Sequence, residues 1–298
     1  MTLRRSIVVL GIAALLGAGG CTRAEPAAEG GGLDEVASVT KDDALHARLP
    51  EQVRAKGFLR LVTDASYAPM EYFAADGRTI IGFEPDLAVA LGQVLGVRTE
   101  MVMGSFSTAL DDVGAGVYDG VLSSMTDTEE RRAKADFVNY LSTGTSILVQ
   151  RGNPGSITEL ADLCGRSAAT EQGTFQEEML IRLRTECGDR GLTIRSVATN
   201  ADVLVELRTG RVAAVLQDYP PASFVATDER TSAFFQLASD HQYERVLFGI
   251  AVAKDNTALR DCLRDALQRL IDSGVYADLL ARWELSASRV PAAMVNGA

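Results

Sequence analysis

The sequence predicts an α/β protein with mostly parallel sheets, and two observations lead to that class. Short apolar strand patterns alternate with helical patterns along residues 59–273. The chain also has 298 residues, of which 47% are hydrophobic and 23% charged, as in a globular protein of about two domains. We therefore expect strands and helices in alternation, distributed over two units.

The first half of the pattern begins with a strand and continues in alternation. Pro85 opens a helix that Gly96 closes, because proline suits the first turn of a helix and glycine its end. Further helices are expected at residues 107–114 and 129–135. The strands expected around them lie at residues 59–63, 97–103, 119–123 and 145–150.

The second half repeats the alternation. Asn200 is expected to cap a helix that ends at Gly210, and residues 258–273 form an amphipathic helix with Cys262 on its apolar face. This cysteine is therefore expected to be a buried core thiol. The remaining helices are expected at 156–163 and 175–185, and the strands at 167–170, 192–198, 212–217 and 246–253.

Composition excludes several classes of function. The formal net charge is −11, whereas a nucleic-acid-binding protein needs a basic surface. His46 and His241 are the only histidines, which excludes a multi-histidine metal site and leaves little room for histidine-based catalysis. Phosphate-loop, GxSxG, HExxH and paired CxxC motifs are missing from the sequence. We expect no metal, no cofactor and no nucleic-acid partner.

The N-terminus predicts export. Arg4 and Arg5 precede a short apolar run, small residues follow, and then comes Cys21, so residues 1–20 are typical of a signal peptide. A cysteine in this position resembles the lipidated residue of bacterial lipoproteins, although Ala18 stands where a large aliphatic residue is usual. The alternative is plain secretion with an unmodified Cys21. We expect residues 21–49 to be a lipid-anchored flexible tether on the outer side of the cell membrane.

The other two cysteines, Cys164 and Cys187, each lie beside a glycine in connecting segments that flank one strand–helix unit. In an oxidising compartment they are the natural disulfide pair. Two unpaired thiols are the alternative, because connectivity does not follow from sequence.

Six short runs occur in an order typical of one protein family. They are GFLRLVTDASYAPME at 57–71, GFEPDLA at 82–88, YDGVLSSMTDTEER at 118–131, GTFQE at 173–177, GRVAAVLQD at 210–218 and FGI at 248–250. Together they resemble the polar-amino-acid-binding proteins of ABC importers, the extracellular solute-binding proteins of family 3, over about residues 50–285.

The resemblance implies a periplasmic-binding-protein-like fold of type II, in which two α/β lobes are joined by two crossover strands and a ligand is held in the cleft between them. Lobe 1 would comprise residues 50–145 and 249–288, lobe 2 residues 146–248, and residues 289–298 a C-terminal tail. The crossovers would lie near 142–145 and 246–249. It further implies a monomer that delivers a free amino acid to the transmembrane subunits of an ABC permease.

The resemblance also assigns the groups that hold the ends of a free amino acid. Arg131 aligns with the arginine that binds the α-carboxylate, and its planar fork suits that group. Thr126 and Thr174 align with positions that add hydroxyl or N–H donors. Asp218 aligns with the acid that takes the α-ammonium, and Ser124 with a backbone carbonyl that contacts it.

The side chain of the ligand would lie against Tyr67 and Phe106, which align with an aromatic pair. Asp64 aligns with an acid that meets the far end of basic or polar side chains, although an aspartate there can equally cap a turn. The chain departs from the family at Met70, where an aromatic is common, and at Ala213, where an acid is usual.

Two other functions fit the same resemblance. Dehydratases that act on prephenate-like substrates share the fold, so a cyclohexadienyl-dehydratase-like enzyme is one alternative, and a ligand-sensing surface lipoprotein is another. An enzyme of that kind needs an acidic side chain beside the hydroxyl group that leaves the substrate. The six motifs give no reason to place an acid in that role. The pair Arg131 and Asp218 suits binding without turnover, so we expect no enzymatic activity.

Overall fold

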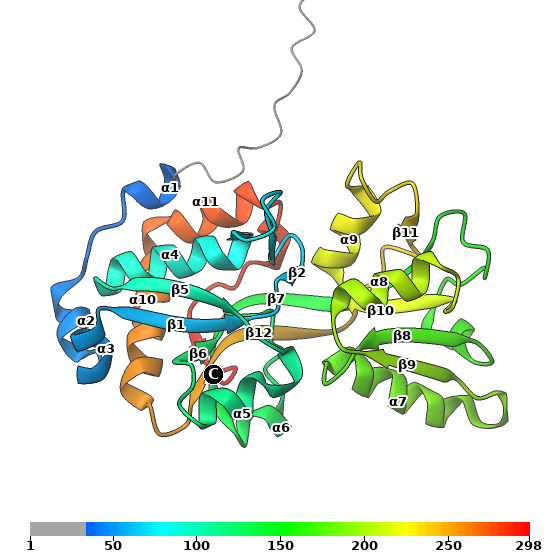
Figure 1. Cartoon of the computed structure of the whole chain (residues 1–298), viewed down its shortest axis with the longest axis horizontal. Coiled ribbons are helices and arrows are strands. Elements are labelled where there is room, and N and C mark those ends of the chain that lie inside the picture. The colour runs from blue at the N-terminus through cyan, green and yellow to red at the C-terminus, as the bar shows by residue number, and fades with distance from the viewer. Residues whose placement is uncertain (1–33) are drawn as a thin grey trace, which may run out of the picture.

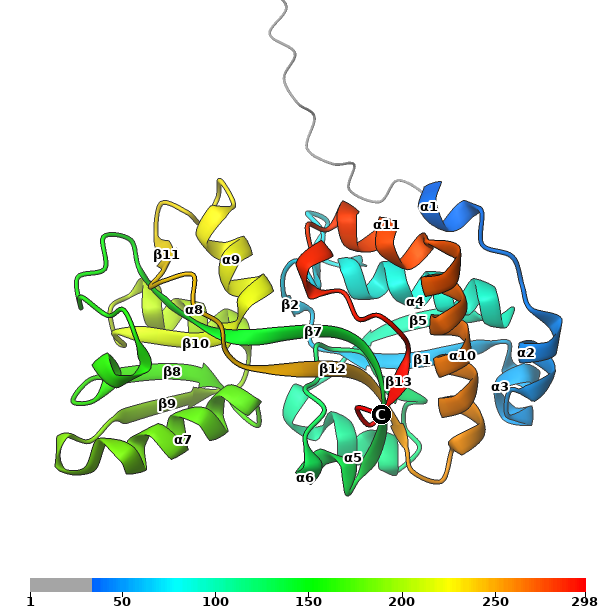
Figure 2. The ribbon, with the colours of Figure 1, turned by 180° about the vertical axis from the view of Figure 1, so that it is seen from behind.

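A computed structural model describes residues 34–298 and shows two α/β lobes side by side (Figure 1). The expected signal peptide and Cys21 lie outside the described residues. Two long strands, β7 (Ala135–Gln150) and β12 (Tyr243–Ala253), run antiparallel to each other from one lobe to the other, as Figure 2 shows from behind. The chain therefore passes between the lobes along a paired two-stranded connection.

One sheet extends through both lobes in the strand order β5-β1-β6-β12-β7-β10-β8-β9. In the first lobe, β1 (Phe58–Thr63) is parallel to β5 (Arg98–Met103) and to β6 (Gly120–Val121). In the second lobe, β8 (Ser167–Glu171) is parallel to β9 (Thr193–Val197) and to β10 (Ala214–Asp218). This arrangement confirms the predicted α/β class. The expectation of mostly parallel sheets is wrong for the described residues, because β7 and β12 pair antiparallel with each other and with their neighbours β6 and β10.

Helices cover the sheet in each lobe. The first lobe has η1 (Phe106–Thr108), α4 (Phe83–Leu95), α5 (Ala109–Gly114), α6 (Glu129–Arg132), α10 (Thr257–Ser273) and α11 (Val275–Arg282). The second has η2 (Leu160–Leu163), α7 (Phe175–Cys187), η3 (Gly188–Arg190), α8 (Asn200–Arg208) and α9 (Tyr219–Thr227). None of the helices within residues 34–298 is long and apolar enough to cross a membrane.

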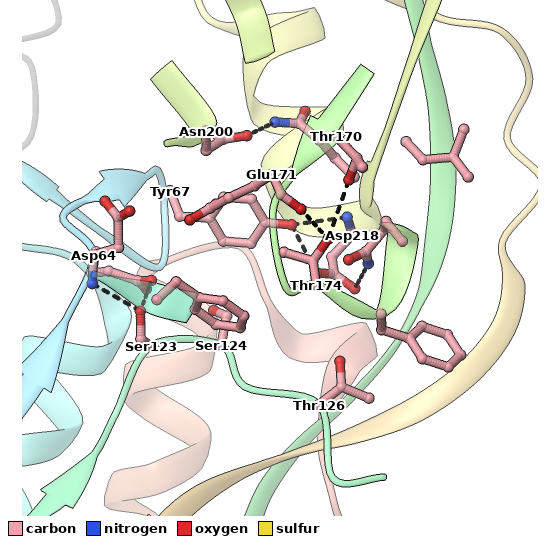
Figure 3. A pocket seen from close by; sticks show the side chains of 16 residues that line it. Asp64, Tyr67, Ser123, Ser124, Thr126, Thr170, Glu171, Thr174, Asn200 and Asp218 are labelled. Carbon is pink, nitrogen blue, oxygen red and sulfur yellow. Dashed lines mark hydrogen bonds between the residues drawn. The ribbon is translucent and has the colours of Figure 1, made fainter. Parts of the chain in front are cut away.

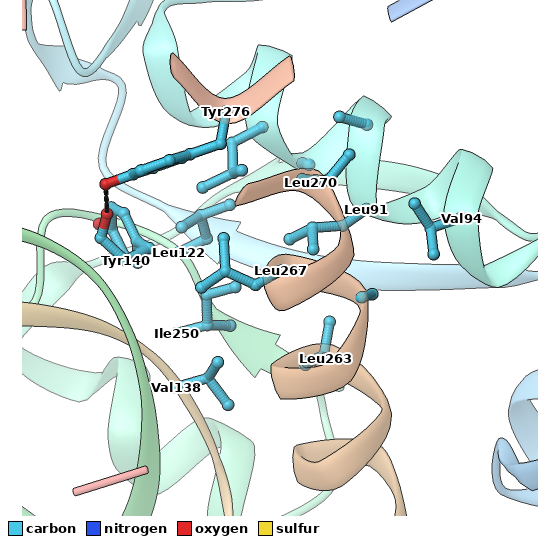
Figure 4. Packing of buried hydrophobic residues seen from close by; sticks show 14 of the residues in the cluster. Leu91, Val94, Leu122, Val138, Tyr140, Ile250, Leu263, Leu267, Leu270 and Tyr276 are labelled. Carbon is cyan, nitrogen blue, oxygen red and sulfur yellow. Dashed lines mark hydrogen bonds between the residues drawn. The ribbon is translucent and has the colours of Figure 1, made fainter. Parts of the chain in front are cut away.

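The largest core lies in the first lobe, where α10 and α4 pack against the strands (Figure 4). Leu263, Leu267 and Leu270 recur at helical spacing on α10 and face Leu91 of α4 and Ile250 of β12. The pattern of apolar residues at positions three and four apart explains why this amphipathic helix forms where the sequence predicts it. Cys262 lies on the same face and is a free, buried thiol, as expected.

The first lobe also contains a small sheet that is separate from the main one. It consists of β2 (Ser66–Tyr67), β3 (Glu71–Phe73) and β4 (Ile80–Ile81), paired antiparallel. Gly82 links β4 to α4 with a φ of 137°, and a Cβ there would lie 2.2 Å from the carbonyl oxygen of Met70. Only glycine fits such a close approach of two backbone segments.

The prediction that residues 21–49 form a flexible tether is wrong for the final part of that range. Residues of α1 (Asp34–Ala37) and α2 (Asp43–Arg48) pack on the first lobe, and α3 (Glu51–Lys56) follows directly. Val36, Leu45 and Leu49 are buried there, so a few well-spaced apolar residues outweigh the polar composition of the segment. Asp42 caps α2 by accepting hydrogen bonds from the N–H groups of Ala44 and Leu45.

The residues expected as a C-terminal tail, 289–298, also belong to the fold. Val290 is buried, and β13 (Met294–Val295) pairs with β7 after the turn η4 (Ser286–Ser288). A further short strand, β11 (Phe235–Leu237), pairs with β7 in the second lobe. Both strands are too short to give a periodic signal, and the long partner strand supplies their hydrogen bonds.

Several predicted elements differ in extent. The strand expected at 145–150 is only the C-terminal part of β7, which already begins at Ala135. The helix expected at 129–135 therefore has to end before that strand, and it ends at Arg132. The helix expected at 156–163 is reduced to η2. Thr199, rather than Asn200, caps α8, since its Oγ1 accepts a hydrogen bond from the N–H of Asp202. The unpredicted α9 begins at Tyr219 with two prolines in its first turn, where proline is tolerated.

Cys164 and Cys187 form the expected disulfide, which ties the end of η2 to the last residue of α7. The bond closes a loop with a sequence separation of 23 residues that contains β8 and all of α7. Such a crosslink restricts the unfolded chain and stabilises the folded one.

We expect reduction of this disulfide to lower the free energy of unfolding by about 3 kcal/mol, the value for loop closure of this size. Urea unfolding of the protein with and without dithiothreitol measures the change. The double variant Cys164→Ser/Cys187→Ser is the matched control, because dithiothreitol should leave its unfolding midpoint unchanged. Equal midpoints for the oxidised and reduced wild-type protein would contradict the expectation.

Candidate functional site

A cleft between the lobes collects the ends of their parallel strands (Figure 3). Asp64 follows β1 and Ser123 follows β6, whereas Glu171 ends β8 and Asp218 ends β10. Ligands of α/β sheets bind at the carboxyl ends of parallel strands, so this cleft is the candidate site. The other residues that line it are Tyr67, Glu71, Phe106, Ser124, Thr126, Thr170, Thr174, Phe175, Gln176, Asn200, Leu216 and Gln217.

The structure brings most of the predicted site residues together in this cleft. Those that line it are Asp64, Tyr67, Phe106, Ser124, Thr126, Thr174 and Asp218. Arg131 does not line the cleft, but it contacts two residues that do, Thr126 and Phe106. The eight positions, which are spread over more than 150 residues of sequence, therefore converge on one region.

Asp218 is a buried acid with neutral hydrogen-bond donors. Tyr67 of the opposite lobe donates its hydroxyl proton to Asp218 Oδ2 at 2.7 Å, and Gln176 Nε2 donates to Oδ1 at 2.9 Å. Burial raises the pKa of Asp218 to about 7, although these donors and the charge of Arg131 lower it. The carboxylate is thus oriented but not neutralised, which suits it to bind an ammonium group.

Arg131 is a buried cation without a charged hydrogen-bond partner in its two contacts. Its Nη1 donates to the carbonyl oxygen of Thr126 and its Nη2 to that of Gly173 in the other lobe, both at 2.8 Å. The guanidinium carbon lies 5.5 Å from the ring centroid of Phe106. Burial lowers the pKa of Arg131 below its ordinary value. Carbonyl oxygens supply no negative charge, so this guanidinium suits an anionic group at the edge of the cleft.

Asp64 and Glu171 are two further buried acids, one from each lobe. Burial is the main cause that raises the pKa of Asp64, and burial together with the negative charge of Asp64 raises the pKa of Glu171 to about 9. Asp64 Oδ1 and Glu171 Oε1 are buried without a hydrogen-bond partner among residues 34–298. Unpaired buried acceptors favour a ligand that carries hydrogen-bond donors and positive charge.

A second acid pair, Glu71 in the lining of the cleft and Glu84 behind it, supports the first-lobe wall. Glu84 Oε1 accepts hydrogen bonds from both the N–H and the hydroxyl of Ser124, each at 2.8 Å, and from the hydroxyl of Tyr140. Ser124 has a φ of 47°, an unusual value for serine that these bonds maintain. Ser123 links Glu71 to the N–H of Asp64. Burial and the neighbouring Glu84 raise the pKa of Glu71 well above its ordinary value, so the pair retains a proton.

Hydrogen bonds across the cleft show that the lobes are closed. Asn200 Nδ2 of the second lobe donates to the carbonyl oxygen of Ser66 at 2.8 Å. Together with the contacts of Tyr67 and Arg131 described above, this bond joins the lobes around the cleft. The described geometry is therefore the arrangement in which a small ligand would be enclosed.

Sequence reasoning missed several of the lining residues. Glu171 and Gln176 are the most informative of them, because one contributes charge and the other orients Asp218. Glu171 could have been found, since it directly follows the strand expected at 167–170, as Asp218 follows the one expected at 212–217. Within residues 34–298 no group of three or more His, Cys, Asp and Glu side chains is arranged to hold a metal ion.

Comparison with known proteins reveals similarity along most of the chain. Residues 59–286 match the family described as bacterial extracellular solute-binding proteins, family 3. The arginine-binding protein ArgT of Corynebacterium glutamicum is 30% identical over 256 residues, which cover 85% of this chain and 82% of that protein. The L-cystine-binding protein TcyJ of Escherichia coli is 27% identical over 237 residues, covering 79% and 85% of the two chains.

Solved structures agree with this similarity. An ancestral arginine-binding protein bound to arginine superimposes with a TM-score of 0.71 at 28% sequence identity. The match covers 76% of this chain and 98% of that one. It confirms the binding-protein fold of type II that the sequence resemblance implied.

The raised pKa of Asp218 predicts how stability depends on pH. An unfolded aspartate titrates near 3.9 and Asp218 in the folded protein at about 7, so the folded state binds the proton more tightly. This group therefore makes the free energy of unfolding fall as pH rises from about 4 to about 7. Urea unfolding of ligand-free protein across that range should show a fall that is smaller in Asp218→Asn, by up to about 4 kcal/mol.

The exposed Asp240 provides the control, because Asp240→Asn should retain the wild-type dependence on pH. An Asp218→Asn variant with the wild-type dependence would show that this carboxyl is not destabilised in the closed cleft.

Proposed function

The chain belongs to the bacterial extracellular solute-binding proteins, family 3, and on that premise we propose that it captures a free polar or basic amino acid between its lobes and delivers it to the permease of an ABC importer. Its relatives are amino-acid-binding proteins rather than enzymes, so the chain is the solute-binding component and not a catalyst. The family is extracellular, and binding takes place outside the cytoplasm.

The observation that carries the proposal is the presence of a buried arginine and a buried aspartate at one interlobe cleft. A free amino acid has an α-carboxylate and an α-ammonium, and a dry cleft must neutralise both. Arg131 offers N–H donors to the carboxylate, with Thr126 and Thr174 beside it. Asp218 offers a carboxylate to the ammonium, with the backbone of Ser124 on the opposite wall.

The rest of the cleft favours a side chain that is polar or cationic. Tyr67 and Phe106 present rings that can pack against an aliphatic stem. Asp64 and Glu171 add two carboxyl groups beyond the one that the α-ammonium requires, and Gln217 Oε1 is a further buried acceptor without a partner among the described residues. An arginine side chain, with five N–H donors and one positive charge, matches these acceptors best. The relatives named for arginine support that choice.

Ligand exchange requires the lobes to separate. We assign the hinge to the stretches of β7 and β12 between the lobes, near residues 142–145 and 246–249. Lobe 1 would then move as residues 50–145 with 249–288, together with the segments 34–49 and 289–298 that pack on it, and lobe 2 as residues 146–248. Opening breaks the few cross-cleft hydrogen bonds but leaves the core of each lobe intact.

A thermal-shift screen of the purified protein against the common amino acids tests the function. L-arginine at 100 times its Kd should stabilise the protein by about 2.7 kcal/mol. Arg131→Ala should weaken binding by about 100-fold, because it leaves a buried carboxylate without its partner. Arg54→Ala, which removes an exposed arginine outside the cleft, is the matched control and should bind normally. No shift with any amino acid would refute the function, and normal binding by Arg131→Ala would refute its assigned role.

We also propose that Cys21 anchors the protein to the membrane. The support comes from the sequence alone: two arginines, a short apolar run and small residues precede this cysteine, as in bacterial lipoproteins. An anchored binding protein stays close to its permease, which raises the local concentration of the complex.

Cells that express the full chain should incorporate labelled palmitate into it, and the protein should sediment with membranes. Cys21→Ser should abolish the label and release the protein, whereas Cys262→Ser, which alters a buried core thiol, should leave the label in place. Membrane-free wild-type protein would favour plain secretion instead.

A further inference from the structure

Asp64 and Glu171 face the same cleft from opposite lobes. Asp64 follows β1, and Glu171 is the last residue of β8, so closure brings together two acids that separate when the lobes open. Both side chains are at least nine-tenths buried, with exposed fractions of 4% and 9%. Two buried carboxyl groups that line one cleft and act on each other electrostatically do not both remain ionised without a positive charge beside them.

We propose that the closed cleft takes one positive charge at the Asp64–Glu171 pair, either the distal cation of the ligand or a proton, and that Glu171 thereby makes selection between charged and neutral amino acids dependent on pH. This inference rests on the proposed function and extends it to Glu171, which the family resemblance did not assign.

None of the described groups around the pair supplies a competing cation. Tyr67 on β2, Glu71 on β3, Asp202 on α8 and Asp218 on β10 are the titratable groups that act on it or line the same cleft, and each is neutral or acidic. Arg131 on α6 is engaged with two carbonyl groups on another side of the cleft.

The titration of the pair agrees with this geometry. Burial, followed by the charge of Asp64, raises the pKa of Glu171 to about 9, so the ligand-free closed cleft holds a proton there at neutral pH. In the open form the two carboxyl groups are separated and hydrated, and both titrate near their ordinary values. Closing without a cation therefore requires a proton from the solvent.

L-arginine and L-citrulline separate the two cases, because they have nearly the same shape but differ in the charge of the terminal group. Arginine brings the positive charge with it. Citrulline must close the cleft with a proton taken from the buffer, so its complex contains one proton more. A difference of one proton changes the ratio of the two dissociation constants about tenfold per pH unit. The affinity for citrulline relative to that for arginine should therefore fall by about 100-fold between pH 5.5 and pH 7.5.

Isothermal titration calorimetry of the full protein tests this directly. Both ligands are titrated at pH 5.5, 6.5 and 7.5, and at pH 7.5 in phosphate and in Tris, whose ionisation enthalpies differ. The proposal predicts that citrulline takes up about one more proton than arginine, and that the ratio of the Kd for citrulline to that for arginine rises about 100-fold.

Glu171→Gln removes one acid of the pair with little change in volume. In this variant the ratio should change by less than about tenfold over the same pH range, and the difference in proton uptake should fall in step. Glu229→Gln, which alters an exposed glutamate of the same lobe, should behave as the wild-type protein. Circular dichroism of each variant reports folding independently of binding.

The outcomes distinguish this proposal from the proposed function on which it rests. Two results would refute the proposal that a proton replaces the ligand cation, and would leave the amino-acid-binding function standing. In one, arginine binds while the ratio of the two Kd values is constant with pH, and in the other, citrulline fails to bind even at pH 5.5. If Glu171→Gln keeps the full wild-type pH dependence, Glu171 is not the group responsible. If no amino acid binds at any pH, the proposed function itself fails, and this inference fails with it.

Discussion

The closed cleft buries more charge than the protein itself neutralises, and the rest of the site follows from that. Asp64, Glu171 and Asp218 place three carboxyl groups in a region from which water is largely excluded, so the Asp64–Glu171 pair holds a proton when no ligand is present. Arg131 adds a cation whose two hydrogen bonds go to neutral carbonyls. Unpaired charge in such a place is costly. A zwitterion with a cationic side chain supplies the missing partners at each position, so the ligand is in effect the last component of the closed structure.

The architecture makes this cost depend on the position of the lobes. Asp64 belongs to one lobe and Glu171 and Asp218 to the other, and β7 and β12 carry the chain between the two lobes. Opening therefore rehydrates the acids without disturbing either core. The wall around them is rigid, since Glu84 holds Ser124 in a left-handed conformation. A ligand that neutralises the charges thus binds the closed state more tightly than the open state. This difference in affinity shifts the population toward the closed state.

Much of this could be predicted from the sequence, and the failures have physical causes. Residues inside contiguous motifs, such as Arg131 and Asp218, could be proposed from the sequence because local runs preserve their context, and the structure places both at the cleft. Glu171 was missed because its importance arises from a partner more than 100 residues away, a proximity that only tertiary folding creates. Leu45 and Leu49 were assigned to a tether because the surrounding composition is polar, yet burial of a few apolar side chains suffices to fold that segment onto the core.

The most direct test is a crystal structure of the protein with bound L-arginine. We expect the α-carboxylate on Arg131, the α-ammonium on Asp218 and the guanidinium between Asp64 and Glu171, with the lobes closed as described. An amino acid bound in the reverse orientation, or a guanidinium directed to solvent while both acids remain in contact with each other, would contradict the view that the ligand completes the charge of the cleft.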